Sequence, residues 1–213
     1  MAIWVFLTLL LAHAGWRGIL MRCLITGGLA VSMLTQVWLL WLDGQLSLAT
    51  ALPLHLCSLF GVLSAALVWL RPLWLFHLSL LLGAPCAFMA LCFPAVIDNS
   101  RQFMMSLAFY RLHTLILCAP LLLAKEGLAL PTNAQSSFLL ANGYLLFVAL
   151  FNRLFTTNYL FLAAAPAGTP LAALFARGEA FYVCALELCA MLVMAWLAHL
   201  YAWLCAHSLR QLA

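Results

Sequence analysis

The feature that most constrains this chain is a series of seven long apolar segments with few charges between them. An α-helix rises about 1.5 Å per residue, so most of these segments can cross about 30 Å of hydrocarbon. No segment shows the alternating pattern of a membrane-spanning strand. The sequence therefore predicts an all-α polytopic membrane protein, a bundle of about seven transmembrane helices. The segments are 2–16, 20–42, 51–70, 73–94, 103–124, 137–162 and 180–206.

The composition excludes a water-soluble fold. Hydrophobic residues make up 68% of the 213 residues and charged residues only 7%, whereas a soluble domain has about 25% charged residues. No polar stretch is long enough for a soluble module, so we expect one transmembrane helical domain over residues 1–213. The net charge of +4 comes from few residues. We therefore expect no nucleic-acid partner.

The N-terminal segment has features of a signal peptide, because residues 12–14 (AHA) resemble a cleavage site. No Lys or Arg precedes the apolar run, however, so we expect a short or tilted first helix. If that helix is cleaved or does not span, six helices remain. The positive-inside rule favours an N-terminus outside and a cytoplasmic C-terminus. The basic residues on the predicted cytoplasmic side are Arg17, Arg22, Arg71, Lys125 and Arg210.

A histidine and a cysteine lie two residues apart in the segment 52–57 (LPLHLC), where the third apolar segment begins. Ionisable groups are expensive in hydrocarbon, so each one there is a hypothesis for a functional site. Cys57 would become a nucleophile if a histidine took its proton, and is otherwise a buried packing residue. On a regular helix His55 and Cys57 point about 200° apart. They can share a pocket only if Pro53 disturbs the helix start or one of them faces a neighbouring helix.

The other seven cysteines lie in apolar surroundings, where the simplest interpretation is that they are small packing residues. The sequence contains no CxxC motif and no cysteine and histidine cluster at zinc-ligand spacing. We therefore expect neither a metal nor an organic cofactor.

Polar residues of several later segments fall at a similar membrane depth. With the predicted orientation, Cys57 lies roughly 9 Å, Glu187 roughly 10 Å and His113 roughly 15 Å from the outer ends of their helices. Tyr110 is three residues before His113 and shares its helix face. We therefore predict one polar site in that half of the membrane. Its candidate residues are His55, Cys57, Tyr110, Arg111, His113, Asn152, Arg153, Asn158, Tyr159 and Glu187.

Each of these residues has a functional and a structural interpretation. His113 is either a general base or a core histidine bonded to a backbone carbonyl. The charged residues either hold a lipid phosphate or carboxylate or pair with one another between helices; they are Arg111, Arg153 and Glu187. Asn158 and Tyr159 either donate hydrogen bonds to an oxyanion or link neighbouring helices.

Three motifs together resemble a known family. They are residues 52–57 (LPLHLC), 109–113 (FYRLH) and 157–162 (TNYLFL), the last followed by Pro166. In order and spacing the chain is similar, over about residues 18–205, to the YwaF-like bacterial integral membrane family. That family is related to transmembrane protein 164 of animals.

The resemblance implies a polytopic helical bundle and a chemistry. The animal relative is regarded as a phospholipid acyltransferase that works through a cysteine acyl-enzyme with a histidine partner. More distant relatives are the androgen-induced membrane hydrolases of fatty-acid esters, which use Thr and His. Carried over, the nucleophile falls on Cys57 and the histidine on His113. His55 and residues 158–159 match motif positions without an assigned role.

The leading interpretation is an intramembrane lipid acyltransferase or acyl-ester hydrolase that forms a Cys–His acyl-thioester. Its partners would be a membrane phospholipid and a fatty acyl group, and a homo-oligomer is left open. The alternative is a transporter or binding protein with a buried polar site for a small solute. A purely structural membrane subunit is the third interpretation.

Overall fold

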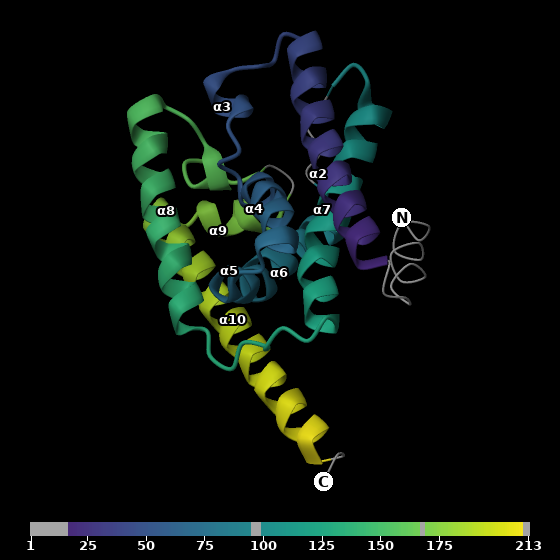
Figure 1. Ribbon diagram of the computed structural model, residues 1–213. Helices are drawn as coiled ribbons and strands as arrows, with labels where there is room; N and C mark the ends of the chain where they lie inside the picture. Colours follow the sequence, from purple (N-terminus) through teal and green to yellow (C-terminus); the bar gives the residue numbers. More distant parts are fainter. Residues whose placement is uncertain (1–16, 95–98, 167–168, 211–213) are drawn as a thin grey trace. The chain divides into compact units, whose positions relative to one another are not determined.

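The structure is a computed structural model that describes residues 17–94, 99–166 and 169–210. It divides into two compact units, Met1–Ala129 and Leu130–Ala213, which are coloured from purple to yellow along the chain in Figure 1. Our expectation of one domain over residues 1–213 stays a prediction. The first predicted segment, 2–16, lies outside the described residues.

The described residues form helices and no strand, which confirms the predicted all-α polytopic membrane fold. Five stretches are long and apolar enough to cross a membrane, and the 15-residue helix α4 is a shorter apolar helix. The first unit contains α2 (Arg17–Leu42), α3 (Leu48–Ala51), α4 (Leu56–Leu70), α5 (Leu73–Leu78), the π-helix η1 (Ser79–Gly83), α6 (Ala84–Cys92) and α7 (Gln102–Lys125). The second contains α8 (Gln135–Phe155), the 3₁₀ helix η2 (Tyr159–Phe161), α9 (Pro170–Phe175) and α10 (Glu179–Arg210).

Proline residues determine both ends of α4. Pro53 has no backbone N–H and disfavours helix in the residue before it, and Leu52 is accordingly extended. At the other end, Pro72 begins α5, and Arg71 closes α4 in a left-handed conformation with φ 56° and ψ 34°. The third predicted segment therefore becomes a helix at Leu56 rather than at residue 51.

The first unit is assembled from α2, α4 and α7, which approach closely at glycines. A Cβ atom on Gly28 of α2 would lie 2.5 Å from Leu115 Cδ1 of α7. A Cβ atom on Gly61 of α4 would lie 3.0 Å from Met33 Sδ of α2 and 3.1 Å from Leu112 Cδ1 of α7. Small residues allow helix backbones in membranes to pack this tightly. Gly61 and Gly28 therefore keep α4 and α2 close to α7.

The loops after α2 and before α7 are joined by a polar cluster. Asp43 accepts hydrogen bonds of 2.6 Å from both the hydroxyl and the backbone N–H of Ser100, and it pairs with Arg101 at 3.1 Å. These Ser100 hydrogen bonds, together with the nearby Arg101 charge, hold the pKa of Asp43 below its ordinary value of 3.8. The cluster fixes where α2 ends relative to the start of α7.

In the second unit, α8 ends at Phe155, seven residues before the end of the predicted segment 137–162. Thr156 adopts a left-handed conformation with φ 53° and terminates the helix. Asn158 and Tyr159 therefore lie beyond α8, at the start of the short 3₁₀ helix η2, and not in a membrane-spanning helix. A further short helix, α9, follows over Pro170–Phe175.

Candidate functional site

The start of α4 positions His55 and Cys57 differently. His55 is the N-cap residue, with an extended backbone (φ −70°, ψ 143°), and its carbonyl accepts the N–H of Leu59 at 2.9 Å. Cys57 lies in the first helical turn. Because His55 is outside the helix, the 200° separation of a regular helix does not apply to this pair. Both side chains are half-buried.

Cys57 packs against an apolar cluster of the first unit. That cluster includes Phe60 of α4 and Leu112 and Leu115 of α7. A thiol in such surroundings is inert unless a base takes its proton. The chemistry of Cys57 therefore depends on whether a base can reach it from α7.

His113 is held in one tautomer by its own helix. Its side chain is 3% exposed, and its Nδ1 lies 2.7 Å from the carbonyl oxygen of Phe109. A carbonyl oxygen only accepts hydrogen bonds, so Nδ1 of the neutral ring carries the proton and donates it. The Phe109 ring packs against the imidazole with 4.1 Å between centroids. The lone pair is therefore on Nε2, for which the described part of the chain forms no hydrogen bond.

Cys57 and His113 each lie within about one turn of the tight crossing of α4 and α7. Gly61, which meets Leu112, is one turn after Cys57 on the same helix face, and His113 directly follows Leu112. Within the described residues no hydrogen bond joins Cys57 Sγ and His113. Catalytic hydrogen bonds often form only when substrate binds, and the pairing of Cys57 with His113 stays a prediction.

Tyr110 and Arg111 precede His113 on α7. Arg111 Nε donates to Ser32 Oγ of α2 at 2.7 Å, and Ser32 Oγ donates in turn to the carbonyl of Gly28. Among the residues that the structure describes, the terminal nitrogens of Arg111 form no hydrogen bond. Tyr110 is half-buried. The Arg111 guanidinium is therefore anchored by one nitrogen and retains donors for an anion.

The candidates of the second unit have structural partners. Asn152 Nδ2 donates to the carbonyl of Tyr159 at 2.8 Å, and its Oδ1 accepts the Thr157 hydroxyl at 2.8 Å and the Tyr159 N–H at 2.9 Å. Asn158 bonds the backbone of Ala163 and Ala164 in the same manner. The motif at 157–159 therefore holds the loop after α8, which contains the left-handed residues Leu160 and Phe161.

The remaining candidates differ in their exposure. Arg153 is exposed in the last turn of α8, and Glu187 is half-buried on α10. Tyr159 is fully buried, and its ring meets Phe151 edge-on at 6.0 Å. Our expectation that the residues of this unit share one depth with Cys57 stays a prediction.

Sequence reasoning did not anticipate two buried hydroxyl groups of the first unit. In the described residues, Ser64 Oγ and Ser79 Oγ are buried without a hydrogen-bond partner. Ser64 is seven residues after Cys57, on the same side of α4, and Ser79 begins the π-helix η1. The sequence spacing could have identified Ser64, because a serine seven residues after Cys57 in an apolar segment lies on the same helix face. No group of three or more His, Cys, Asp or Glu residues suited to a metal is found in the described ranges.

The whole chain was compared with known proteins, and residues 1–198 match the model of the TMEM164 family. The chain belongs to the TMEM164 family. No curated protein and no solved structure matches it. This family membership agrees with the resemblance found in residues 52–57 and 109–113. Together, the family and the long apolar helices support a multi-pass membrane protein. The orientation of the termini stays a prediction.

Proposed function

We propose that this TMEM164 family member is an intramembrane acyl-transfer enzyme in which Cys57 is the nucleophile and His113 the base. The observation that carries the proposal is the bond from His113 Nδ1 to the Phe109 carbonyl. It leaves the lone pair on Nε2, the nitrogen that a general base needs, on a helix packed against the one that contains Cys57.

The first half of the reaction forms an acyl-thioester. His113 Nε2 accepts the Cys57 thiol proton, and the thiolate attacks the carbonyl carbon of a phospholipid acyl ester. A carbon–sulfur bond forms and the ester carbon–oxygen bond breaks. The lysolipid oxygen leaves with the proton that His113 returns.

The second half transfers the acyl group. His113 Nε2 accepts the proton of an acceptor hydroxyl, whose oxygen attacks the thioester carbonyl. The carbon–sulfur bond breaks, a new ester forms, and Cys57 regains its proton from His113. A lysolipid acceptor makes the protein an acyltransferase, whereas water makes it a hydrolase.

Arg111 is the candidate for head-group recognition that belongs to the same unit as Cys57 and His113. It is two residues before His113, and Ser32 anchors its Nε at 2.7 Å. An anchored guanidinium has lost part of its rotamer freedom before it meets a phosphate. Arg111 therefore suits a positioning role for the phosphate of the acyl donor.

The test is to detect the acyl-enzyme. Purified protein is incubated in micelles with a phosphatidylcholine whose acyl chain contains an alkyne, and the labelled peptide is identified by mass spectrometry. We expect a hydroxylamine-sensitive adduct on Cys57 that is lost in Cys57→Ser. Cys86→Ser is the matched control, because Cys86 is a half-buried cysteine on α6 within electrostatic range of Cys57. An adduct that persists in Cys57→Ser contradicts the mechanism, and no adduct with any acyl donor favours the solute-binding alternative.

A further inference from the structure

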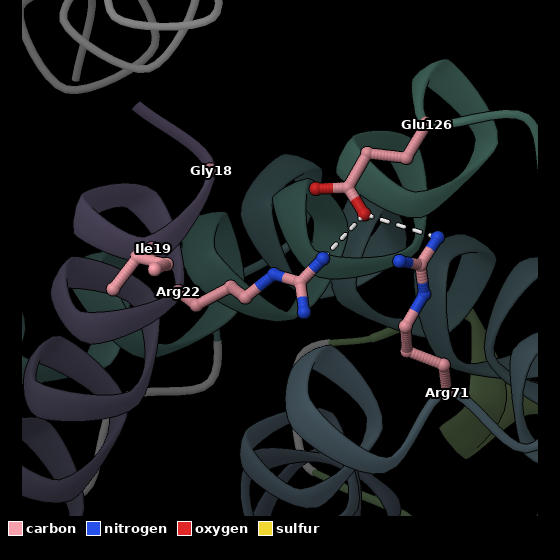
Figure 2. Close-up of a pocket in the computed structure, with 5 residues that line it drawn as sticks. All are labelled: Gly18, Ile19, Arg22, Arg71 and Glu126. Carbon is pink, nitrogen blue, oxygen red and sulfur yellow. Dashed lines mark hydrogen bonds and ion pairs between the residues drawn. The ribbon is translucent and has the colours of Figure 1, made fainter. Parts of the chain in front are cut away.

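Three charged side chains converge at the end of the first unit where α2 begins and α4 and α7 end. Arg22 Nη2 lies 2.6 Å and Arg71 Nη2 lies 3.2 Å from the same oxygen, Oε2 of Glu126. Figure 2 shows both guanidinium groups directed at that carboxylate. We call these residues, with Gly18 and Ile19 of the first turn of α2, the arginine cradle.

The cradle lines an open cavity of about 450 Å³ and has an excess of donors. Two guanidinium groups share one carboxylate, so the local charge is positive. Within the described residues, Nε of Arg22 is buried without a hydrogen-bond partner, although the Arg22 side chain is 17% exposed. A buried donor without an acceptor is energetically unfavourable. An anion in this cavity would have unused N–H groups to bind.

The backbone at Arg71 supports a role for its side chain. Arg71 has φ 56° and ψ 34°, a left-handed conformation that residues other than Gly and Asn rarely adopt. Glycine is the usual residue at such a helix end. The side chain extends from this unfavourable position into the cavity, where it reaches Glu126 (Figure 2).

We propose that the arginine cradle binds the phosphate of an anionic lipid head group. Planar guanidinium groups bind phosphate oxygens in pairs, with charge-assisted hydrogen bonds. The cradle lies at the ends of apolar helices, which is the level at which head groups meet the protein. In the absence of a ligand, Glu126 occupies the position of the anion and neutralises one of the two arginines.

The cradle is separate from the proposed catalytic pair. Arg71 is 14 residues after Cys57, which corresponds to about 21 Å along α4. In a phospholipid, only a few covalent bonds separate the phosphate from the nearest acyl ester. One lipid therefore cannot hold its phosphate in the cradle while Cys57 attacks its ester. The lipid in the cradle is distinct from any substrate of Cys57, and its binding does not require Cys57 to be catalytic.

The test measures retention of phosphatidylglycerol by the full-length protein in detergent, by native mass spectrometry, with phosphatidylcholine as the reference lipid. Arg71→Gly removes the side chain and relieves the left-handed backbone, so it tests binding without adding strain. We expect it to weaken binding of phosphatidylglycerol about tenfold, the loss of one charge-assisted contact. Arg177→Gln is the matched control, because Arg177 is an exposed arginine that lies over the Phe181 ring.

Glu126→Gln should change the retention of phosphatidylglycerol in the opposite direction. It removes the competing carboxylate while preserving its size, so we expect retention of phosphatidylglycerol to rise about tenfold. Addition of inorganic phosphate distinguishes the two sources of the ligand. Displacement of the lipid by millimolar phosphate shows that the phosphate group alone is recognised, and resistance to it shows that the lipid tail contributes.

Equal retention by the wild type and Arg71→Gly overturns the proposal and leaves the three charges as a link between helices. A fall in retention with Glu126→Gln, in a variant that still unfolds cooperatively, overturns it as well. Neither measurement uses Cys57, so failure here and failure of the acyl-enzyme test are distinguishable.

Discussion

Gly83 is a position where a single methyl group should disturb the packing of the first unit. A Cβ atom there would lie 2.6, 2.8 and 3.0 Å from three ring atoms of Phe60, whereas carbon atoms in ordinary contact are about 3.5–4.0 Å apart. Phe60 is 1% exposed, and its rigid ring has no free direction in which to move. Either η1 or α4 must therefore shift in Gly83→Ala.

The size of the effect follows from two opposing contributions. Overpacking a core costs about 1–3 kcal/mol, and replacing a helical glycine by alanine returns about 0.5–1 kcal/mol. We expect Gly83→Ala to lower the free energy of unfolding by about 0.5–2 kcal/mol. Because Phe60 is less than one turn from Cys57 on α4, formation of the Cys57 adduct should fall as well.

The assay is reversible unfolding in mixed micelles, followed by circular dichroism. Gly27→Ala is the control, because nothing lies within 4 Å of a Cβ atom at this exposed position of α2. It should be neutral or stabilising. Phe60→Leu should reduce the effect of Gly83→Ala, since the two positions are in contact. If Gly83→Ala is as stable as Gly27→Ala, the close approach of η1 and α4 is wrong.

Three further predictions concern single side chains. His113→Ala should slow acylation of Cys57 about 10²–10⁴-fold in a time course of adduct formation, whereas His77→Ala, whose ring bonds the carbonyl of residue 129, should leave the rate unchanged. Asp43 should stabilise the fold above its unfolded pKa of 3.8 and lose that contribution as the pH falls through its lower folded value. Ser100→Ala should flatten this pH dependence when the free energy of unfolding is measured from pH 7 to 3. A pH profile that is unaltered in Ser100→Ala would show that Asp43 is not its source. Asn152→Ala should destabilise the loop after α8 by about 2–3 kcal/mol, through three lost hydrogen bonds, and hydrogen exchange in residues 156–164 should rise; unchanged exchange there would refute the role of Asn152.

The membrane helices could be predicted because the signal is local. Long apolar runs with few charges specify spanning helices without reference to tertiary contacts, and the described part of the chain contains them. Helix ends were predicted less well. The apolar run of α8 continues to residue 162, yet the helix ends at Phe155, because Asn152 bonds Tyr159 and Thr157 across the turn. Such a side-chain contact leaves no mark in a hydropathy pattern.

The candidate residues also differ in whether local sequence is enough to predict them. Cys57 and His113 could be selected from residue type and motif, and the bond from His113 to Phe109 spans only four residues. The arginine cradle could not be assembled in this way. Its members Arg22, Arg71 and Glu126 are 49 and 55 residues apart, and membrane topology alone accounts for the two arginines. Only the packing of α2, α4 and α7 shows that two arginines share one carboxylate.

The contacts of the first unit also bear on which part would move in the proposed acyl transfer. Asp43 with Ser100 joins α2 to α7 at one end, and Arg22 with Glu126 joins them at the other. The start of α4 has no side-chain cap at its N-terminus and follows a break at Pro53. In the proposed mechanism we therefore expect the thiol to approach the base through a movement of the first turn of α4, which contains Cys57, because α7 is held at both ends. Stiffening that turn should therefore slow acylation more than any change at the far end of the helix.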